Sequence, residues 1–339
     1  MSAATMRAWW VTEPGPIDGR PLTFGSRPVP VPGPGEIGVR VHVCGVCRTD
    51  LHLCEGDLPP HHARTIPGHE VVGTVERLGA GSSRFTLGER VGIAWLRWTC
   101  GSCRFCLRGD ENLCVAPRFT GWDADGGYAE HAVVHEDYAY RLPAVFSDAE
   151  AAPLLCAGII GYRALRRTDL PRAGRLGIYG FGASAHLAAQ VALHEGATVH
   201  VLTRSPDARA LALELGVASA GPVDSAPPEP LDAAISFAPS GAIVPGALRA
   251  LDRGGTLVLA GIYVSDLPPL QYERDLFEER QLRSVTANTR RDGEEFLALA
   301  AEIPLKVSLS PYPFEDAAVA LADLAHDRVK GAAILEMPS

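Results

Sequence analysis

Hydrophobic residues change their spacing near Pro153, and this change divides the chain into two regions. Residues 7–155 are rich in Val, Gly and Pro and contain short alternating runs, such as 37–43 and 71–75, which predict β-strands. After Pro153, apolar runs alternate with Ala- and Leu-rich stretches of helical period. The pattern therefore predicts a β-rich region followed by an α/β region.

Four apolar runs in the second region have the length and composition of buried strands. They cover residues 176–180, 198–203, 231–237 and 255–261. Because helical stretches separate them, they predict a parallel, doubly wound sheet. The tail predicts a helix over 293–302, a strand over 306–313 and a further helix–strand pair, and we expect it to fold back onto the first domain.

Length and charge narrow the class of protein. The 339 residues allow two domains, each with its own core. A net charge of -9 repels nucleic acids and anionic lipids. The N-terminus lacks the pattern of a signal peptide, and no apolar run reaches membrane-spanning length. We therefore expect a cytoplasmic protein that binds neither nucleic acid nor membranes.

Half of the eight cysteines form a compact motif, C-x2-C-x2-C-x7-C. They are Cys100, Cys103, Cys106 and Cys114, in a lobe expected over residues 95–118. Four thiolates suit a tetrahedral zinc ion, and a closed sulfur site leaves no position for a substrate, so this zinc would be structural. The alternatives are reduced cysteines without a ligand and an iron–sulfur cluster. The cluster is disfavoured because the fourth cysteine is distant and no proline follows it.

A second set of metal-binding residues is spread along the chain. Cys47, His69 and Cys156 offer two thiolates and an imidazole, with Glu70 adjacent to the histidine. Three protein ligands leave one position open, which is the ligand count of a catalytic zinc. Taken singly, the cysteines could be buried apolar thiols and His69 a structural histidine. Spacing alone does not decide between these interpretations.

A glycine-rich turn indicates a dinucleotide site. Gly180, Gly182 and Ala185 match G-x-G-x-x-A between a strand-like and a helix-like run. The first glycine permits the tight turn, the second lets the backbone approach a pyrophosphate, and the alanine packs helix on strand. With Ala183 and Ser184, the turn would hold the pyrophosphate at the N-terminus of the helix.

The end of the second predicted strand of this region bears on the choice of cofactor. An acid is expected there if the ribose 2'-hydroxyl is bound, but the sequence has Thr203, Arg204 and Ser205. A hydroxyl and a guanidinium, supported by Arg209, suit a 2'-phosphate and favour NADP. NAD bound through a weak ribose contact is the alternative.

Together these motifs resemble those of the zinc-containing medium-chain dehydrogenase/reductases. Residues 45–50 and 68–70, the four-cysteine lobe and the glycine-rich turn occur in the order and at the separations of that superfamily. Around residues 154–162 and 179–186 the chain is most similar to bacterial zinc alcohol dehydrogenases related to cinnamyl-alcohol dehydrogenases. The resemblance covers nearly the whole chain.

The resemblance implies a fold, an activity and an assembly. The fold is α/β, with a GroES-like β-rich catalytic domain over residues 1–155 and 289–339 and a Rossmann domain over 156–288. The activity is hydride transfer between a primary alcohol or aldehyde, aliphatic or aromatic, and NADP(H) or NAD(H), with two zinc ions per chain. A specialised zinc polyol or sugar reductase and a non-catalytic protein that binds zinc and dinucleotide are the alternatives. A homodimer or homotetramer is implied, with the strand near 282–287 as the candidate sheet edge.

The same resemblance implies roles for individual residues near the metal. Cys47, His69 and Cys156 would hold the catalytic zinc, with Glu70 as a transient ligand. Asp50 would accept the other ring N–H of His69 and so fix its tautomer.

Further roles concern the proton, the cofactor and the substrate. Thr49 and His52 match a relay that carries the alcohol proton to the surface. Arg48, where many relatives have histidine, would contact the cofactor pyrophosphate or remain an ordinary surface arginine. An apolar substrate pocket would be lined by Leu58, Trp95 and Trp122, although the two tryptophans could equally pack beneath the cysteine lobe.

Overall fold

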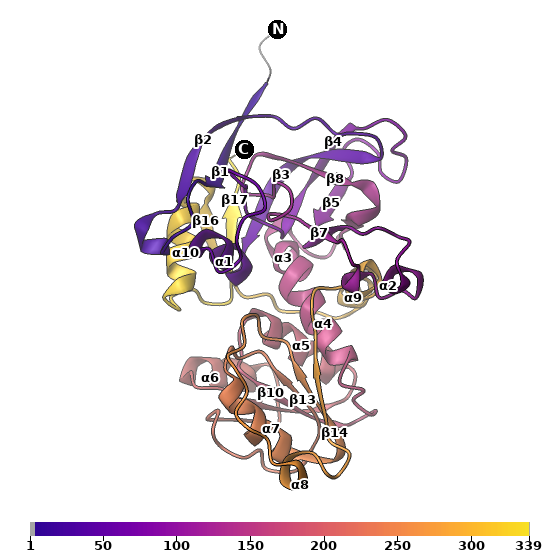
Figure 1. The fold of residues 1–339 in the computed structure, drawn as a ribbon, viewed down its shortest axis with the longest axis vertical. Helices are drawn as coiled ribbons and strands as arrows, with labels where there is room; N and C mark the ends of the chain where they lie inside the picture. Colours follow the sequence, from indigo (N-terminus) through magenta and orange to yellow (C-terminus); the bar gives the residue numbers. More distant parts are fainter. Residues whose placement is uncertain (1–3, 339) are drawn as a thin grey trace. The chain divides into compact units, whose positions relative to one another are not determined.

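The computed structural model describes residues 4–338, which divide into two compact units (Figure 1). The first unit runs to Cys156 and also contains Ala287–Glu302 and the chain from Val307 onward. The second unit contains Ala157–Thr286 and Ile303–Lys306. Within residues 4–338, no helix is long and apolar enough to cross a membrane.

A seven-stranded sheet forms the centre of the first unit, in the order β16-β17-β3-β4-β5-β9, with β8 paired to β3. The strands are β3 (Glu36–Val46), β4 (Val71–Leu78), β5 (Arg90–Ile93), β8 (His131–His135), β9 (Ala139–Arg141), β16 (Leu309–Pro313) and β17 (Ala332–Glu336). Alternate residues of β3, including Ile37, Val39 and Val41, are buried in the core, as the period of two predicts. The C-terminal strand β17 pairs antiparallel with β3, so the tail completes the same sheet.

The other elements of the first unit surround this sheet. They are the hairpin β1 (Thr5–Val11) and β2 (Leu22–Pro28), the short pair β6 (Leu96–Trp98) and β7 (Arg118–Phe119), and the helices α1 (Arg48–Glu55), α2 (Arg104–Leu107), α3 (Asp148–Pro153), α9 (Arg290–Glu302) and α10 (Ala317–Ala325). The predicted tail of helix, strand, helix and strand corresponds to α9, β16, α10 and β17.

The second unit is built on a six-stranded parallel sheet in the order β12-β11-β10-β13-β14-β15. The strands are β10 (Arg175–Tyr179), β11 (Thr198–Leu202), β12 (Ser219–Gly221), β13 (Leu231–Ser236), β14 (Leu251–Leu259) and β15 (Gln281–Ser284). The helices are α4 (Ile159–Arg166), α5 (Ala183–His194), α6 (Pro206–Glu214), α7 (Val244–Ala250) and α8 (Tyr272–Asp275). Counted within this unit, the strand order is 3-2-1-4-5-6, which is that of a Rossmann fold.

The predicted α/β fold is confirmed, with two differences in detail. The four predicted apolar runs correspond to β10, β11, β13 and β14. The strand β12 was not predicted because it has only three residues, Ser219–Gly221, and these are only partly buried. The strand β15 lies at the edge of the sheet, as predicted, but it ends at Ser284.

Leu248 on α7 tests the core of the second unit because its side chain is fully buried among Leu231, Val244 and Leu257. We expect Leu248→Ala to lower the free energy of unfolding by about 2–5 kcal/mol, since it removes apolar contacts and leaves a cavity. The same change at Leu213, which is 53% exposed, should cost less than about 0.5 kcal/mol.

Urea unfolding, monitored by far-UV circular dichroism, would give the free energy of unfolding of both variants. Tryptophan fluorescence would not report on the second unit, because all five tryptophans precede residue 123. Equal loss of stability in the two variants would contradict the assignment of this core.

Candidate active site

Four side chains of the first unit converge on one point: Cys47, His69, Glu70 and Cys156. One ligand atom from each lies within 4.8 Å of the other three. The Sγ atoms of Cys47 and Cys156 are 3.9 Å apart, and His69 Nε2 lies 3.3 Å from Cys156 Sγ. His69 and Glu70 are almost fully buried, whereas the two thiols are partly exposed. The fold thus brings together residues that are up to 109 positions apart in the chain.

Asp50 connects the start of α1 to the segment that carries His69. Its Oδ2 accepts a hydrogen bond from the backbone N–H of Cys47, the residue that precedes the helix, at 2.9 Å. Its Oδ1 accepts from Gly68 N at 2.9 Å and from His69 Nδ1 at 3.1 Å. An ionised carboxylate only accepts hydrogen bonds, so the neutral imidazole of His69 carries its proton on Nδ1, and its Nε2 lone pair faces Cys156.

Cys156 lies in a π-helical turn, Leu154–Gly158, that follows α3. Pro153 ends α3 and has no N–H to continue its hydrogen-bond pattern, which favours a change of helical geometry at this point. Single π-turns occur frequently at functional sites because they redirect one side chain. Here the redirected residue is the second thiol of the cluster.

Two glycines leave room for the cluster. A side chain at Gly45 would place its Cβ 1.8 Å from Glu70 Oε2, so the carboxylate occupies the space that a larger residue would fill. Gly68 has a φ of +97°, and a Cβ there would lie 2.5 Å from the ring of Tyr128. Substitution at either position would displace a residue of the cluster or its neighbour.

Burial and neighbouring charges shift the pKa values of the groups in this cluster. A hydrogen bond from Cys156 lowers the pKa of Cys47, while that same bond, together with burial, raises the pKa of Cys156. Burial lowers the pKa of His69, but the charges and hydrogen bonds of Asp50 and Cys47 together outweigh burial and raise the pKa well above its usual value. Burial, and then the charge of Cys47, raises the pKa of Glu70. Without a cation, these groups cannot all ionise together.

A zinc ion fits this set of donors. Two thiolates on one tetrahedral zinc, each about 2.3 Å from the metal, lie about 3.8 Å apart. The sulfur atoms of Cys47 and Cys156 are separated by 3.9 Å. A histidine whose second nitrogen donates to a carboxylate is also the usual form of a zinc-bound imidazole.

The helix α1 carries the residues predicted for proton and cofactor contacts. The hydroxyl of Thr49 lies 3.7 Å from Cys47 Sγ, and His52 lies one turn further along the same helix. The guanidinium of Arg48 bonds to Asp327 Oδ1 at 2.5 Å, in an exposed ion pair that the sequence did not indicate.

Aromatic rings extend outward from His69. The ring of Trp95 meets His69 edge-on, with centroids 5.0 Å apart. Phe119 and Trp122 stack on Trp95 at 4.8 and 6.0 Å, and His61 stacks on Trp122 at 4.2 Å. Phe119 and His61 were not predicted to belong to this group, because no spacing rule connects them to Trp95. Leu58, the other residue predicted to line the pocket, lies close to His61 in the sequence. Its backbone N–H donates to His52 O.

The four cysteines of the lobe also converge, with their sulfur atoms within 4.8 Å of one another. The Cys103–Cys106 and Cys100–Cys106 sulfur distances are 3.5 and 4.0 Å, close to the spacing of thiolates on one zinc. All four are free thiols, and Cys114 is buried. Hydrogen bonds from the backbone N–H groups of Cys106 and Val115 lower the pKa of Cys103 to about 6.

An ion pair anchors the lobe to α9. Arg290 Nη2 bonds to Glu111 Oε2 at 2.8 Å, and the backbone N–H of Arg290 donates to Glu111 Oε1 at 2.7 Å. Glu111 is buried and lies three residues before Cys114. The lobe is therefore fixed at a second point besides its cysteines.

In the second unit, the glycine-rich turn lies between β10 and α5. Gly180 has a φ of +82°, which favours glycine, and its N–H donates to Leu202 O. Gly182 is the residue that precedes α5, and a Cβ there would meet no atom within 4 Å. Ala183 and Ser184 begin the helix, and Ala185 is fully buried. The turn therefore leaves its backbone N–H groups approachable at the helix N-terminus.

The residues after β11 have defined local partners. Ser205 precedes α6 and accepts a hydrogen bond from Ala208 N at 3.2 Å, so its hydroxyl caps that helix. Arg209 Nη1 donates to the carbonyl oxygens of Thr203 and Arg204. Thr203 is buried, whereas Arg204 is exposed. Neither the cap nor the role of Arg209 in bracing the strand end was predicted.

The two thiol clusters and the Rossmann unit define a zinc-binding dehydrogenase, and comparison with known proteins agrees. Residues 33–144 match the alcohol dehydrogenase GroES-like domain, and residues 185–302 match the zinc-binding dehydrogenase family. The chain is 57% identical to the probable alcohol dehydrogenase AdhA of Mycobacterium tuberculosis over 98% of each chain. It is 34% identical to an alcohol dehydrogenase of Geobacillus stearothermophilus over 94% of this chain and 97% of the relative.

Solved structures agree with these relatives. A cinnamyl alcohol dehydrogenase of Sorghum bicolor aligns with a TM-score of 0.87 at 26% identity, over 98% of each chain. A thermostable alcohol dehydrogenase of Pyrobaculum aerophilum aligns with a TM-score of 0.89 at 27% identity, over 98% of this chain and all of that one. The chain therefore belongs to the zinc-type alcohol dehydrogenases of the medium-chain dehydrogenase/reductase superfamily. It is an NAD(P)-dependent oxidoreductase that acts on small alcohols or aldehydes.

Asp50→Asn tests whether this carboxylate supports the cluster. We expect the variant to bind zinc about 10–100-fold more weakly, because an amide cannot accept from His69, Gly68 and Cys47 with the strength of a carboxylate. Competition with a chromophoric chelator would measure the affinity. Asp137→Asn is the matched control, because Asp137 also lies beside a histidine, His135, but outside the cluster. Equal zinc affinity in both variants would contradict the assigned role.

Proposed function

We propose that the chain interconverts primary alcohols and aldehydes, aliphatic or aromatic, with NADP(H) preferred over NAD(H), and that it binds two zinc ions. The observation that carries the proposal is the convergence of Cys47, His69 and Cys156, with His69 oriented by Asp50. The aromatic rings of Trp95 and its stacking partners favour an apolar substrate over a sugar or polyol.

In this proposal, Cys47, His69 and Cys156 hold the catalytic zinc, and Glu70 is a transient ligand. Bound there, zinc would supply Lewis acidity toward the alcohol or carbonyl oxygen, and a bound nicotinamide cofactor would supply the hydride acceptor or donor. The hydroxyl of Thr49 can donate and accept at once, so it would pass the alcohol proton through the cofactor ribose to His52, which lies one turn further along α1.

The residues that contact the cofactor are also proposed. The turn formed by Gly180, Gly182 and the first residues of α5 binds the pyrophosphate, for which its backbone N–H groups are suited. Thr203, Arg204 and Ser205 bind the 2'-phosphate, with Arg204 as the exposed cation. Arg48 is proposed to exchange Asp327 for a cofactor phosphate oxygen.

The assembly is also a proposal. Residues 1–155 and 289–339 form the catalytic domain, residues 95–118 the structural zinc lobe, and residues 156–288 the cofactor domain. The exposed edge strand β15 supports a homodimer or homotetramer that continues the sheet through this strand. The proposed location of this assembly is the cytoplasm.

Removal of one thiol from each cluster distinguishes the two zinc sites. We expect Cys47→Ser to lose one zinc per chain and more than about 100-fold in aldehyde reduction, because the Lewis acid is displaced. We expect Cys103→Ser to lose the other zinc and to lower the melting temperature, while retaining measurable turnover at low temperature. Metal analysis and initial rates with NADPH over a panel of aliphatic and aromatic aldehydes measure both effects.

Two results would overturn these assignments. If the wild-type protein bound only one zinc ion per chain, one of the two zinc sites would be wrongly assigned. If zinc-replete protein reduced no aldehyde of the panel with NADPH or NADH, the proposed activity would be wrong.

Arg204→Ala tests the cofactor preference. We expect NADPH to bind about 10–100-fold more weakly and NADH to be little affected, because a charge-assisted hydrogen bond to the 2'-phosphate is lost. Titration of cofactor fluorescence would give both dissociation constants. Arg172→Ala is the control, because this exposed arginine precedes β10 at the opposite end of the sheet. A wild-type protein that binds NADH more tightly than NADPH would contradict the preference.

A further inference from the structure

Four rings beside the metal cluster lie nearly parallel to one another. Trp122 stacks on Trp95 with an interplanar angle of 10°, and Phe119 stacks on Trp95 at 16° and on Trp122 at 18°. The imidazole of His61 stacks on Trp122 at 28°, with the ring centroids 4.2 Å apart. The three hydrophobic rings are only partly buried, so part of each ring surface remains available to an apolar substrate.

The turn that carries Trp122 packs closely against the segment that leads into the metal cluster. Gly121 has a φ of +79°, and a Cβ there would lie 3.0 Å from Gly68 N. Thr120 N donates to Trp95 O at 2.8 Å, which fixes the turn relative to the first indole. These backbone contacts leave the Trp122 side chain free to change rotamer, so the orientation of its ring depends on side-chain contacts.

Asp123 supplies those contacts together with His61. An ionised carboxylate only accepts hydrogen bonds, so His61 Nδ1 donates to Asp123 Oδ1, at 2.6 Å. Asp123 Oδ2 accepts from Phe119 N at 2.8 Å, and Trp122 Nε1 donates to Pro59 O at 2.8 Å. The loop after α1 and the turn after β7 are therefore joined by polar contacts on both sides of one ring stack. The indole is held both at its N–H and at its face.

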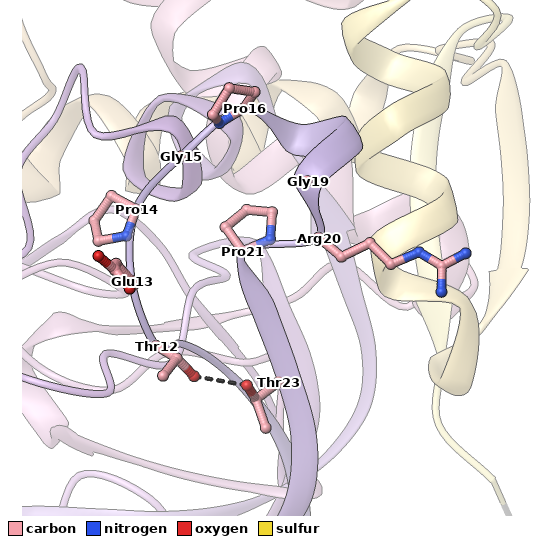
Figure 2. Close-up of a pocket in the computed structure, with 9 residues that line it drawn as sticks. All are labelled: Thr12, Glu13, Pro14, Gly15, Pro16, Gly19, Arg20, Pro21 and Thr23. Atoms are coloured by element: carbon pink, nitrogen blue, oxygen red, sulfur yellow. Dashed lines mark hydrogen bonds between the residues drawn. The ribbon is translucent and has the colours of Figure 1, made fainter.

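The hollow in the N-terminal hairpin is a different kind of surface. Figure 2 shows that it is lined by threonines, prolines, glycines, Glu13 and Arg20, and none of these lining residues is aromatic. Apolar and aromatic side chains line most sites for small organic ligands. The stacked rings beside the metal cluster therefore suit a planar apolar substrate better than this hollow does.

We propose that His61 and Asp123 are specificity-determining residues that position Trp122. Held parallel to Trp95, the second indole extends the apolar surface beside the metal cluster beyond the first ring. A planar aromatic aldehyde large enough to contact both indoles is therefore favoured over a small aliphatic aldehyde. His61 and Asp123 themselves act through Trp122 and take no part in the transfer of hydride or proton. The inference rests on the proposed reduction of aldehydes at the metal cluster.

The substrate selectivity of the zinc-loaded full chain tests the inference. The quantity to measure is kcat/KM for 2-naphthaldehyde divided by kcat/KM for acetaldehyde, both with NADPH. We expect His61→Ala and Asp123→Ala each to lower this ratio about fivefold, mainly through KM for 2-naphthaldehyde, because one ring contact is worth about that factor. The double variant should lose no more than either single variant, since the two residues act as one unit. In the Trp122→Ala background, His61→Ala should leave the ratio unchanged.

A second measurement does not depend on turnover. Near-UV circular dichroism reports on immobilised aromatic rings, and we expect its tryptophan bands to weaken in His61→Ala. His326→Ala is the matched control, because it removes another exposed histidine that pairs with an aspartate, Asp18, at 3.0 Å. The control variant should retain both the selectivity ratio and the spectrum of the wild type.

The outcomes separate this inference from the proposed function. If His61→Ala leaves the ratio unchanged while both aldehydes are still reduced, the inference alone is overturned. If kcat/KM falls by the same factor for both aldehydes, the pair supports the fold rather than selectivity, which also overturns the inference. The same holds if His61→Ala lowers the ratio equally in the wild type and in the Trp122→Ala enzyme. If the wild type reduces neither aldehyde with either cofactor, the proposed function fails and the inference fails with it.

Discussion

The carboxylate of Asp50 is the interaction on which the candidate active site depends. It accepts hydrogen bonds from Cys47 N, Gly68 N and His69 Nδ1, and so joins the start of α1 to the strand-leading segment that carries His69 and Glu70. Asp50 is 2% exposed, and a buried charge is stable only when it is fully hydrogen-bonded. The same three bonds satisfy the carboxylate and fix two residues of the cluster.

The two thiol clusters have similar ligands but different structural surroundings. In the lobe, four sulfur atoms receive hydrogen bonds from nearby backbone N–H groups, such as those from Cys100 to Cys114 and from Cys103 to Cys100. Such a site is complete within one loop. In the other cluster, one thiol comes from the residue before α1 and the other from the π-turn, and an imidazole and a carboxylate complete it. A site assembled from separate elements can combine metal ligands with proton-transfer groups and aromatic side chains. A closed loop of four cysteines offers only metal ligands.

Sequence patterns predicted the fold well where burial is regular. Parallel strands buried on both faces, such as β10 and β13, are continuous apolar runs, so the sheet of the second unit could be predicted from them. The three-residue strand β12 and the π-turn at Cys156 could not, because neither has a periodicity of its own. Their geometry is imposed by neighbours that the local sequence does not contain.

The candidate site was predictable to a different extent for each kind of residue. Cys47, His69 and Cys156 were predicted from their chemistry and from family resemblance, and the fold places them together. The contacts of Phe119 and of His61 with the tryptophans were not, because ring stacking depends on where loops return in space. The bond between Arg48 and Asp327 crosses 279 positions, a separation at which no spacing rule applies.

One short helix links the candidate metal site to the proposed relay. Within its eight residues and the one before it, α1 carries Cys47, Thr49, Asp50 and His52. Residues three apart share a face of a helix, so the spacing of Thr49 and His52 places the two proposed relay groups on one face. The thiol before α1 also lies at the positive end of the helix dipole, which favours a thiolate. Both ends of α1 are held by side-chain carboxylates, Asp50 at the first turn and Glu55 at the last. A displacement of this one helix would therefore move a candidate metal ligand and both proposed relay groups together, so the contacts at its two ends bear directly on the candidate site.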